Sequence, residues 1–176
     1  YYPKALQYLA PVDSPMIAHA KMLRKQHPDA KVIFIGPCIA KKREAIESGI
    51  IDGVLTYDDM QELFAEKNIV LDEIINISLE NKKGTACLSK AYPISHGIIK
   101  AFPELPKGYD YMAVDGPDRC VDALQNIDNL ENVFLEMNIC KDGCVNGPCS
   151  LSVNIKGGSI KATSDVLKYY KNDIRT

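Results

Sequence analysis

Residues 132–149 read NVFLEMNICKDGCVNGPC, and this stretch sets the frame for interpreting the rest of the chain. Its first part, residues 132–135, is a short apolar run that predicts a buried strand. Cys140 and Cys144 follow four positions apart, so both thiols can turn toward one metal centre. Gly143 lies between them and suits such a turn, because glycine accepts a positive φ close to a bulky group. We interpret the stretch as a strand followed by a loop that presents thiols.

Upstream of this stretch, short apolar runs alternate with helical patterns. Ser14 and Pro15 predict a helix start, with Ser14 as the N-cap, and the helix ends before Pro28. Strands are expected at residues 31–35, 52–56, 110–114 and 132–135, the first of them buried on both faces. Helices are expected at residues 15–26, 39–46, 60–66, 95–102, 118–125 and 163–171, and residues 68–84 have no assigned structure. This alternation predicts an α/β fold with a mainly parallel sheet of about four strands flanked by helices.

In parallel sheets, binding sites form in the loops beyond the carboxyl ends of the strands. Cys38 follows the first expected strand and Cys140 follows the fourth. Because these ends share one edge of a parallel sheet, the two loops are expected to meet there. The sequence therefore predicts a cluster of three thiols, from Cys38, Cys140 and Cys144.

Composition narrows the class of protein. The chain has 176 residues, 46% of them hydrophobic and 25% charged, as is ordinary for a globular domain. Its formal charge of −2 argues against a nucleic-acid partner, because there is no basic excess to neutralise phosphates. No apolar segment approaches the roughly 20 residues that a membrane span needs. Six irregularly spaced cysteines favour metal-binding or reactive thiols in the reducing cytoplasm over a secreted disulfide framework.

Three kinds of thiol chemistry remain open at this point. Zinc is often bound by paired Cys-x-x-Cys knuckles, which this chain lacks, and only three histidines are present to complete a site. Iron–sulfur clusters accept less regular spacing and usually take four thiolates, so a fourth ligand from elsewhere would complete the set. A nucleophilic role for Cys140 or Cys144 is disfavoured because no histidine is positioned by sequence as its base. Lys41 follows Cys38 by three residues and sits where a cation would favour an anionic ligand, although a solvated helix charge is the simpler interpretation.

Two motifs carry a family resemblance. Residues 36–42 read GPCIAKK and are followed by Glu44 and Ala45, which resembles the second signature of iron–iron hydrogenases, Pro-Cys-x-x-Lys-Lys-x-Glu-Ala. Residues 136–147 resemble the third signature, Glu-x-Met-x-Cys-x-x-Gly-Cys-x-x-Gly. The order and spacing of these motifs hold from residue 1 to about residue 150.

The resemblance implies a cofactor and roles for individual residues. Members of the family carry the H-cluster, a 4Fe–4S cube joined through one Cys sulfur to a di-iron unit with CO, cyanide and a dithiolate. It implies that Cys38 and Cys140 bind the cube, and that Cys144 supplies the sulfur shared by the cube and the di-iron unit. It implies further that Lys41 acts in catalysis by holding a cyanide, and that Ser14 lies near the di-iron pocket.

The chain also departs from the family pattern. Asn138 and Gly36 stand where prototypical members carry methionines, and Ala10 stands where they carry a serine of the proton relay. The wording of both motifs is closest to the sensory or regulatory branch of the family. The first signature, with the fourth cube ligand, would precede residue 1. We therefore expect residues 1–176 to be the C-terminal part of an H-cluster domain, truncated on its N-terminal side.

The expected function of the intact protein is reversible H2 oxidation and proton reduction, or H2 sensing. The isolated fragment is expected to be inactive. It need not contain a cluster. The alternative is an iron–sulfur binding or assembly-type protein of the same fold without hydrogenase activity. A metal-free α/β domain is a further alternative. Expected partners are the missing N-terminal part of the same protein and electron-carrying iron–sulfur domains or ferredoxin, with no nucleic acid and no membrane. Cys87 and Cys120 are expected to be small buried residues, and Cys149 is near enough to Cys144 in sequence to be a stray ligand or to form a disulfide with it.

Overall fold

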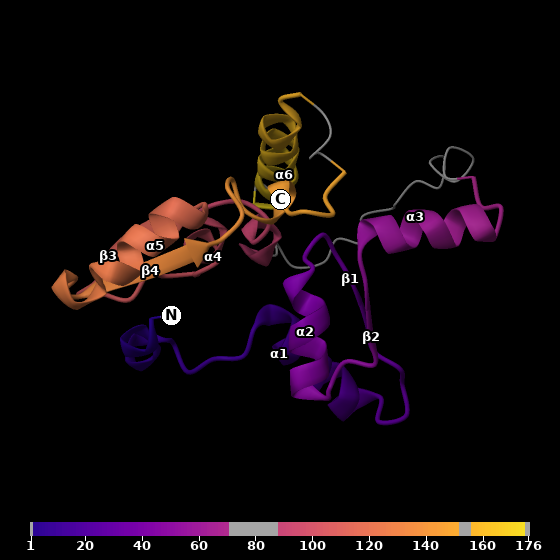
Figure 1. The fold of residues 1–176 in the computed structure, drawn as a ribbon, viewed down its shortest axis with the longest axis horizontal. Coiled ribbons are helices and arrows are strands. Elements are labelled where there is room, and N and C mark those ends of the chain that lie inside the picture. Colours follow the sequence, from indigo (N-terminus) through magenta and orange to yellow (C-terminus); the bar gives the residue numbers. More distant parts are fainter. Residues whose placement is uncertain (1, 71–87, 152–155, 175–176) are drawn as a thin grey trace. The chain divides into compact units, whose positions relative to one another are not determined.

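The computed structural model describes residues 2–70, 88–151 and 156–174 (Figure 1). The unassigned stretch 68–84 and Cys87 lie largely or wholly outside these residues. The chain divides into two compact units. Unit 1 comprises residues 1–9, 82–147 and 151–176, and unit 2 comprises residues 10–81 and 148–150. Each unit is described by itself.

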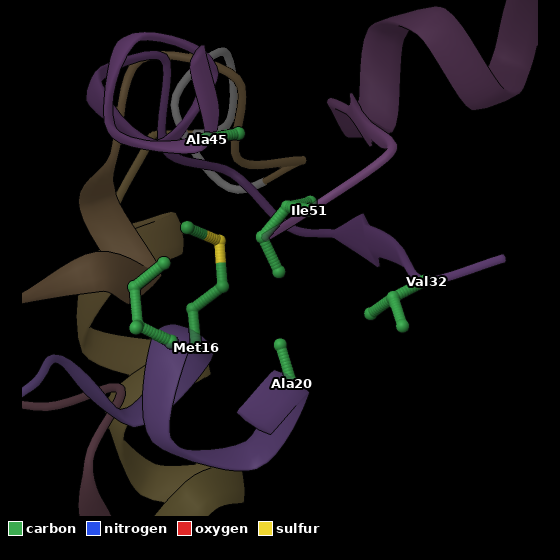
Figure 2. Packing of buried hydrophobic residues seen from close by; sticks show 6 residues of the cluster. Met16, Ala20, Val32, Ala45 and Ile51 are labelled. Carbon is green, nitrogen blue, oxygen red and sulfur yellow. The ribbon is translucent and has the colours of Figure 1, made fainter. Parts of the chain in front are cut away.

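Unit 2 is a small α/β layer. Its elements are α1 (Pro15–Gln26), β1 (Ile33–Ile35), α2 (Ala40–Ser48), β2 (Gly53–Leu55) and α3 (Tyr57–Glu66). β1 and β2 pair in parallel, with Ile33 opposite Gly53 and Ile35 opposite Leu55. The buried cluster of the unit is formed by Met16, Ile17, Ala20, Val32, Ala45 and Ile51. Figure 2 shows the side chain of Met16 reaching from α1 toward Ile51, so the core lies between α1, α2 and the residues that flank the two strands.

Local rules explain where α1 and α3 begin. The Ser14 hydroxyl accepts a hydrogen bond from the Ile17 amide at 3.4 Å, and Pro15 occupies the first helical position. α3 begins one turn earlier than expected, at Tyr57. Thr56 is its N-cap and forms a capping box with Asp59, the two residues exchanging side-chain and backbone hydrogen bonds.

Unit 1 contains the second strand pair. Its regular elements are η1 (Pro3–Tyr8), η3 (Leu88–Ala91), α4 (Gly97–Lys100), β3 (Asp110–Asp115), α5 (Pro117–Gln125), η4 (Ile127–Asn129), β4 (Val133–Asn138), η5 (Cys144–Asn146) and α6 (Gly158–Ile174). β3 and β4 pair in parallel from Asp110 opposite Val133 to Asp115 opposite Asn138. Figure 1 shows α5 running beside this pair. Phe134 of β4 packs edge-on against Phe102, with ring centroids 5.4 Å apart.

The α/β class and the parallel pairing of all four expected strands are confirmed. The strands are distributed over two pairs, however, and do not form a single sheet in the described residues. β1 is also less buried than its apolar run predicts, because Ile33 is 50% exposed and Ile35 is 49% exposed. A three-residue strand with one partner offers too few neighbours to cover both of its faces. The helix expected at residues 95–102 is reduced to the single turn of α4.

Candidate functional site

The loop after β4 carries two of the three predicted thiols. β4 ends at Asn138, and Cys140 lies half-buried two residues further on. The Gly143 amide donates to the Cys140 carbonyl at 3.1 Å, which closes a turn, and the exposed Cys144 opens η5. The expectation that Cys140 and Cys144 occupy a loop beyond a strand is therefore confirmed. We call residues 139–147 the Cys144 loop.

Gly143 is required at its position for two independent reasons. Its φ of 88° and ψ of −163° fall in a region that is essentially restricted to glycine. A Cβ placed there would lie 2.7 Å from the Pro93 carbonyl oxygen and 2.8 Å from backbone atoms of Ile94 and Ser95. The positive φ expected from the sequence is confirmed. The bulky neighbour is the backbone of residues 93–95, so the loop lies directly on that segment.

Hydrogen bonds hold the Cys144 loop against the same segment. The Ser95 amide donates to the Asp142 carbonyl at 3.3 Å, and the Val145 amide donates to the Pro93 carbonyl at 3.0 Å. The loop is also tied to the end of β3, because the Asp142 amide donates to the Asp115 carboxylate at 3.2 Å. These bonds fix the backbone on both sides of Gly143.

Glu136, the first residue of the third motif, has a supporting position that the motif alone does not reveal. Its side chain is only 3% exposed and accepts hydrogen bonds from the Ile99 amide at 3.0 Å and the Asn138 side-chain amide at 3.1 Å. The carboxylate thus joins β4 to the first turn of α4. A signal was present in the sequence, since an acidic residue directly after an apolar run is costly to bury without hydrogen-bond partners.

The second cysteine-bearing loop lies in unit 2. Cys38 is half-buried between the end of β1 and the start of α2, as expected, and its carbonyl accepts from the Lys41 amide at 3.3 Å. The Gly36 amide continues the strand pairing by donating to the Leu55 carbonyl at 3.1 Å. We call residues 36–39 the Cys38 loop.

Glu44 brings together two predicted site residues. The Lys41 ammonium forms an ion pair and hydrogen bond with the Glu44 carboxylate, and Ser14 donates a hydrogen bond to the same carboxylate. Partial burial acts to raise the pKa of Glu44, but the bonds from Lys41 and Ser14 and the Lys41 charge outweigh it and lower that pKa. Ser14 and Lys41 are therefore linked through one anion. Glu44 belongs to the second motif, but its place in the sequence alone indicates no role for it.

A second ion pair joins α2 to α3. The Lys42 ammonium lies 2.7 Å from the Asp59 carboxylate, which also accepts from the amide and hydroxyl of Thr56. The bond from Lys42, followed by the two bonds from Thr56, lowers the pKa of Asp59 to about 2. Asp59 is therefore ionised at any physiological pH and anchors the N-terminus of α3.

The remaining cysteines have separate environments. Cys120 is 6% exposed, and its thiol donates to the Asn138 carbonyl at 3.4 Å, which confirms the expected buried position. Burial is the main cause of its raised pKa. Cys149 belongs to unit 2, and its amide donates to the Pro37 carbonyl at 3.2 Å. Its backbone amide is thus bonded to the Cys38 loop.

The donor chemistry can be compared with the needs of an iron–sulfur cluster. Such clusters are bound by Cys thiolates, usually four. Unit 1 presents Cys140 and Cys144, whereas Cys38 lies in unit 2. Among the residues that the structure describes, no group of three or more His, Cys, Asp or Glu side chains is placed to hold a metal ion. The thiol chemistry fits a cluster, but neither unit by itself provides a full set of ligands, and the predicted three-thiol cluster remains a prediction.

These features define an α/β protein that presents cysteine thiols on loops following parallel strands. A family model described as iron only hydrogenase large subunit, C-terminal domain, matches residues 1–105. The chain belongs to this family. The matched region contains the Cys38 loop and Lys41 and ends before the Cys144 loop. No curated protein matches the chain in sequence. Within the described ranges, no helix combines the length and apolar character needed to cross a membrane.

Proposed function

We propose that the chain supplies part of the H-cluster site of a hydrogenase that interconverts H2 with protons and electrons. The observation that carries the proposal is the family match over residues 1–105, together with a thiol loop after β1 and another after β4. When bound, the cluster supplies the redox chemistry of H2 cleavage. The protein contributes ligands, anchoring charges and a fixed backbone.

The roles proposed for individual residues follow from the resemblance of the two motifs to the hydrogenase signatures. Cys38, Cys140 and Cys144 provide thiolate ligands for iron. Lys41 provides a cation for an anionic ligand of the cluster, and its amine is oriented by Glu44 in the same helix. Ser14 takes part through its bond to that carboxylate.

The three proposed ligands leave a 4Fe–4S cube one protein ligand short of the usual four. We therefore propose that the 176-residue chain by itself has no hydrogenase activity. We propose electron-carrying iron–sulfur domains or a ferredoxin as the electron partner, and H2 sensing with slow turnover as the use of the activity. Support for sensing comes from Asn138, Gly36 and Ala10, which replace residues of the prototypical enzymes.

The same replacements favour a second candidate, an iron–sulfur binding or assembly protein without hydrogenase activity. Asn138 donates its side-chain amide to Glu136 and so serves the structure of β4. Infrared spectra of the matured full-length protein separate the two candidates. CO and cyanide bands support the hydrogenase, whereas a cube without these bands supports the second candidate.

The ligand assignment has its own test. We expect anaerobic reconstitution of the chain with iron and sulfide to give a brown protein with the absorption of an iron–sulfur cluster. Changing Cys38, Cys140 or Cys144 to Ser should each lower the iron content. Cys120→Ser is the matched control, because Cys120 donates to a backbone carbonyl outside both loops. Circular dichroism confirms that each variant folds. Iron content that stays unchanged in all three folded loop variants contradicts the assignment.

A further inference from the structure

Cys149 has a position that its sequence neighbours do not suggest. It belongs to the segment Pro148–Ser150, which is part of unit 2 although it follows the Cys144 loop in sequence. The Cys149 amide donates to the Pro37 carbonyl at 3.2 Å. Because Pro37 is bonded to Cys38, the two cysteines flank the same hydrogen bond. Both thiols are half-buried, and neither is in a disulfide.

Covalent geometry limits the separation of this pair. A carbonyl oxygen and the following Cα lie on the same side of one rigid peptide plane. A bond of 3.2 Å between Cys149 and Pro37 therefore leaves the Cα atoms of Cys38 and Cys149 no more than about 7 Å apart. Disulfides join cysteines whose Cα atoms are about 4.4 to 6.8 Å apart. The upper limit on the separation is therefore close to the top of the disulfide range, and the bond forms if the two side chains turn toward each other.

The surroundings of Cys149 affect how its thiol reacts. Burial and a hydrogen bond to Asp58 raise the pKa of the Cys149 thiol, against opposing contributions from Thr56 and Lys42. Thr56 is itself 3% exposed, so the thiol lies beside the buried start of α3. Attack by Cys149 on a sulfur requires its thiolate, and this step is intramolecular once Cys38 carries the reagent.

We propose that Cys38 and Cys149 form a reversible disulfide that withdraws Cys38 from iron binding while no cluster is present. The oxidant is a low-molecular-weight disulfide. The Cys38 thiolate attacks one sulfur of the reagent, whose S–S bond breaks and releases a first reagent thiolate. The Cys149 thiolate then attacks the Cys38 sulfur and releases a second. The two protons lost by the protein pass to these two thiolates.

The consequence for iron binding rests on the proposed function, because it requires Cys38 to be a ligand. The disulfide itself can form whether or not Cys38 binds iron. Sequence spacing alone favours Cys144 as the partner of Cys149, since only four residues separate them. The structure assigns Cys149 a neighbour inside unit 2 instead.

The test uses the reduced, metal-free chain of 176 residues, treated anaerobically with oxidised glutathione and digested with trypsin. Cys38 falls in peptide 32–41, and Cys144 and Cys149 fall in peptide 142–156. We expect a linked pair of these peptides as the main product, with fragmentation placing the bond at Cys149. Dithiothreitol should separate them. The absence of a linked pair, or a bond placed at Cys144, overturns the proposal.

Two variants provide an independent reading. Cys149→Ser should abolish the linked pair, whereas the matched control Cys144→Ser should retain it. A link that persists in Cys149→Ser also overturns the proposal. Reconstitution with iron and sulfide then tests the consequence. The oxidised chain should take up less iron than the reduced chain. If the disulfide forms without changing iron uptake, the disulfide stands and Cys38 is not a ligand, so the failures of the two proposals are distinguishable.

Discussion

Replacing Gly143 by alanine tests whether the Cys144 loop is held in the described conformation. The backbone at Gly143 has a φ of 88° and a ψ of −163°, a region that costs a side-chain-bearing residue about 1 to 3 kcal/mol. The new Cβ would also lie 2.7 to 2.8 Å from backbone atoms of Pro93, Ile94 and Ser95. These atoms belong to the main chain and cannot rotate away.

The magnitude follows from these two contributions. Forcing an extra methyl into a packed site typically costs about 1 to 3 kcal/mol. The strain and the clash together predict a loss of about 2 to 6 kcal/mol in the free energy of unfolding. A typical domain has about 5 to 15 kcal/mol in total. Gly143→Ala should therefore unfold the region around the loop at a much lower urea concentration.

Gly108→Ala is the matched control. Gly108 has the same φ of 88°, but a Cβ there would meet no atom within 4 Å. Both variants restrict the unfolded chain equally, by about 0.4 to 1 kcal/mol, so this effect cancels in the comparison. The difference between the variants contains the clash together with the part of the strain at Gly143 that depends on ψ, and the clash alone is expected to contribute about 1 to 3 kcal/mol.

Urea denaturation followed by circular dichroism measures the overall change, and hydrogen exchange with mass spectrometry locates it. Peptides from residues 139–147 and 93–99 should lose protection in Gly143→Ala and keep it in Gly108→Ala. Equal stability of the two variants, with unchanged protection in these peptides, would refute the contact between the loop and residues 93–95.

Three further changes test the acidic side chains. Glu44→Ala should release the Lys41 amine from its ion pair. Because a partly exposed ion pair is worth about 0.2 to 1 kcal/mol, labelling of Lys41 by an amine-reactive reagent should rise by up to about fivefold. Unchanged labelling argues against the pair. The pKa of Asp59 is lowered from 3.8 to about 2, so its stabilising effect is complete above pH 3.8 and is lost as the pH falls toward 2. Acid unfolding of Asp59→Asn should therefore lack this part of the pH dependence, and identical profiles contradict the assignment. Glu136→Ala leaves the Ile99 amide without its acceptor and should cost about 1 to 3 kcal/mol in urea unfolding, whereas Glu136→Gln, which keeps an acceptor, should cost less; equal losses would show that this bond is not the cause.

Local features were predictable from the sequence because they depend on neighbouring residues. Ser14 and Pro15 start α1 as expected, since a hydroxyl acceptor followed by proline satisfies the first turn of a helix. Cys38 and Cys140 follow strands, as the apolar runs before them indicate. The predicted start of α3, at residue 60, was wrong by one turn, because the helix begins at Tyr57. The signal was available, because Thr56 and Asp59 have the spacing of a capping box.

The pairing of strands was harder to predict. An apolar run such as residues 31–35 indicates a strand, but it does not say which strand lies beside it. β1 pairs with β2 and β3 pairs with β4, so each pair joins strands that follow one another along the chain. The single sheet expected from the alternation of strands and helices requires a further pairing, between a strand of the β1–β2 pair and a strand of the β3–β4 pair. Only tertiary packing decides such a pairing.

The supporting contacts of the site could not be predicted. The sequence indicated a positive φ at Gly143, but the backbone of residues 93–95 that covers it comes from a distant part of the chain. The bond from Ile99 to Glu136 and the bond from Cys149 to Pro37 are likewise non-local. Contacts of this kind leave no periodic pattern in the sequence.

The bond between Cys149 and Pro37 also has a consequence for biosynthesis. A ribosome adds about 5 to 20 residues per second, and the N-terminal part of a chain folds first. α1, β1, α2, β2 and α3 emerge well before Pro148–Ser150, the segment that completes unit 2. For several seconds the nascent unit 2 therefore exists with the Pro37 carbonyl not yet bonded to its partner. Closure of that bond is a late event in the maturation of the chain, and it comes only after the loop that carries Cys140 and Cys144 has been synthesised.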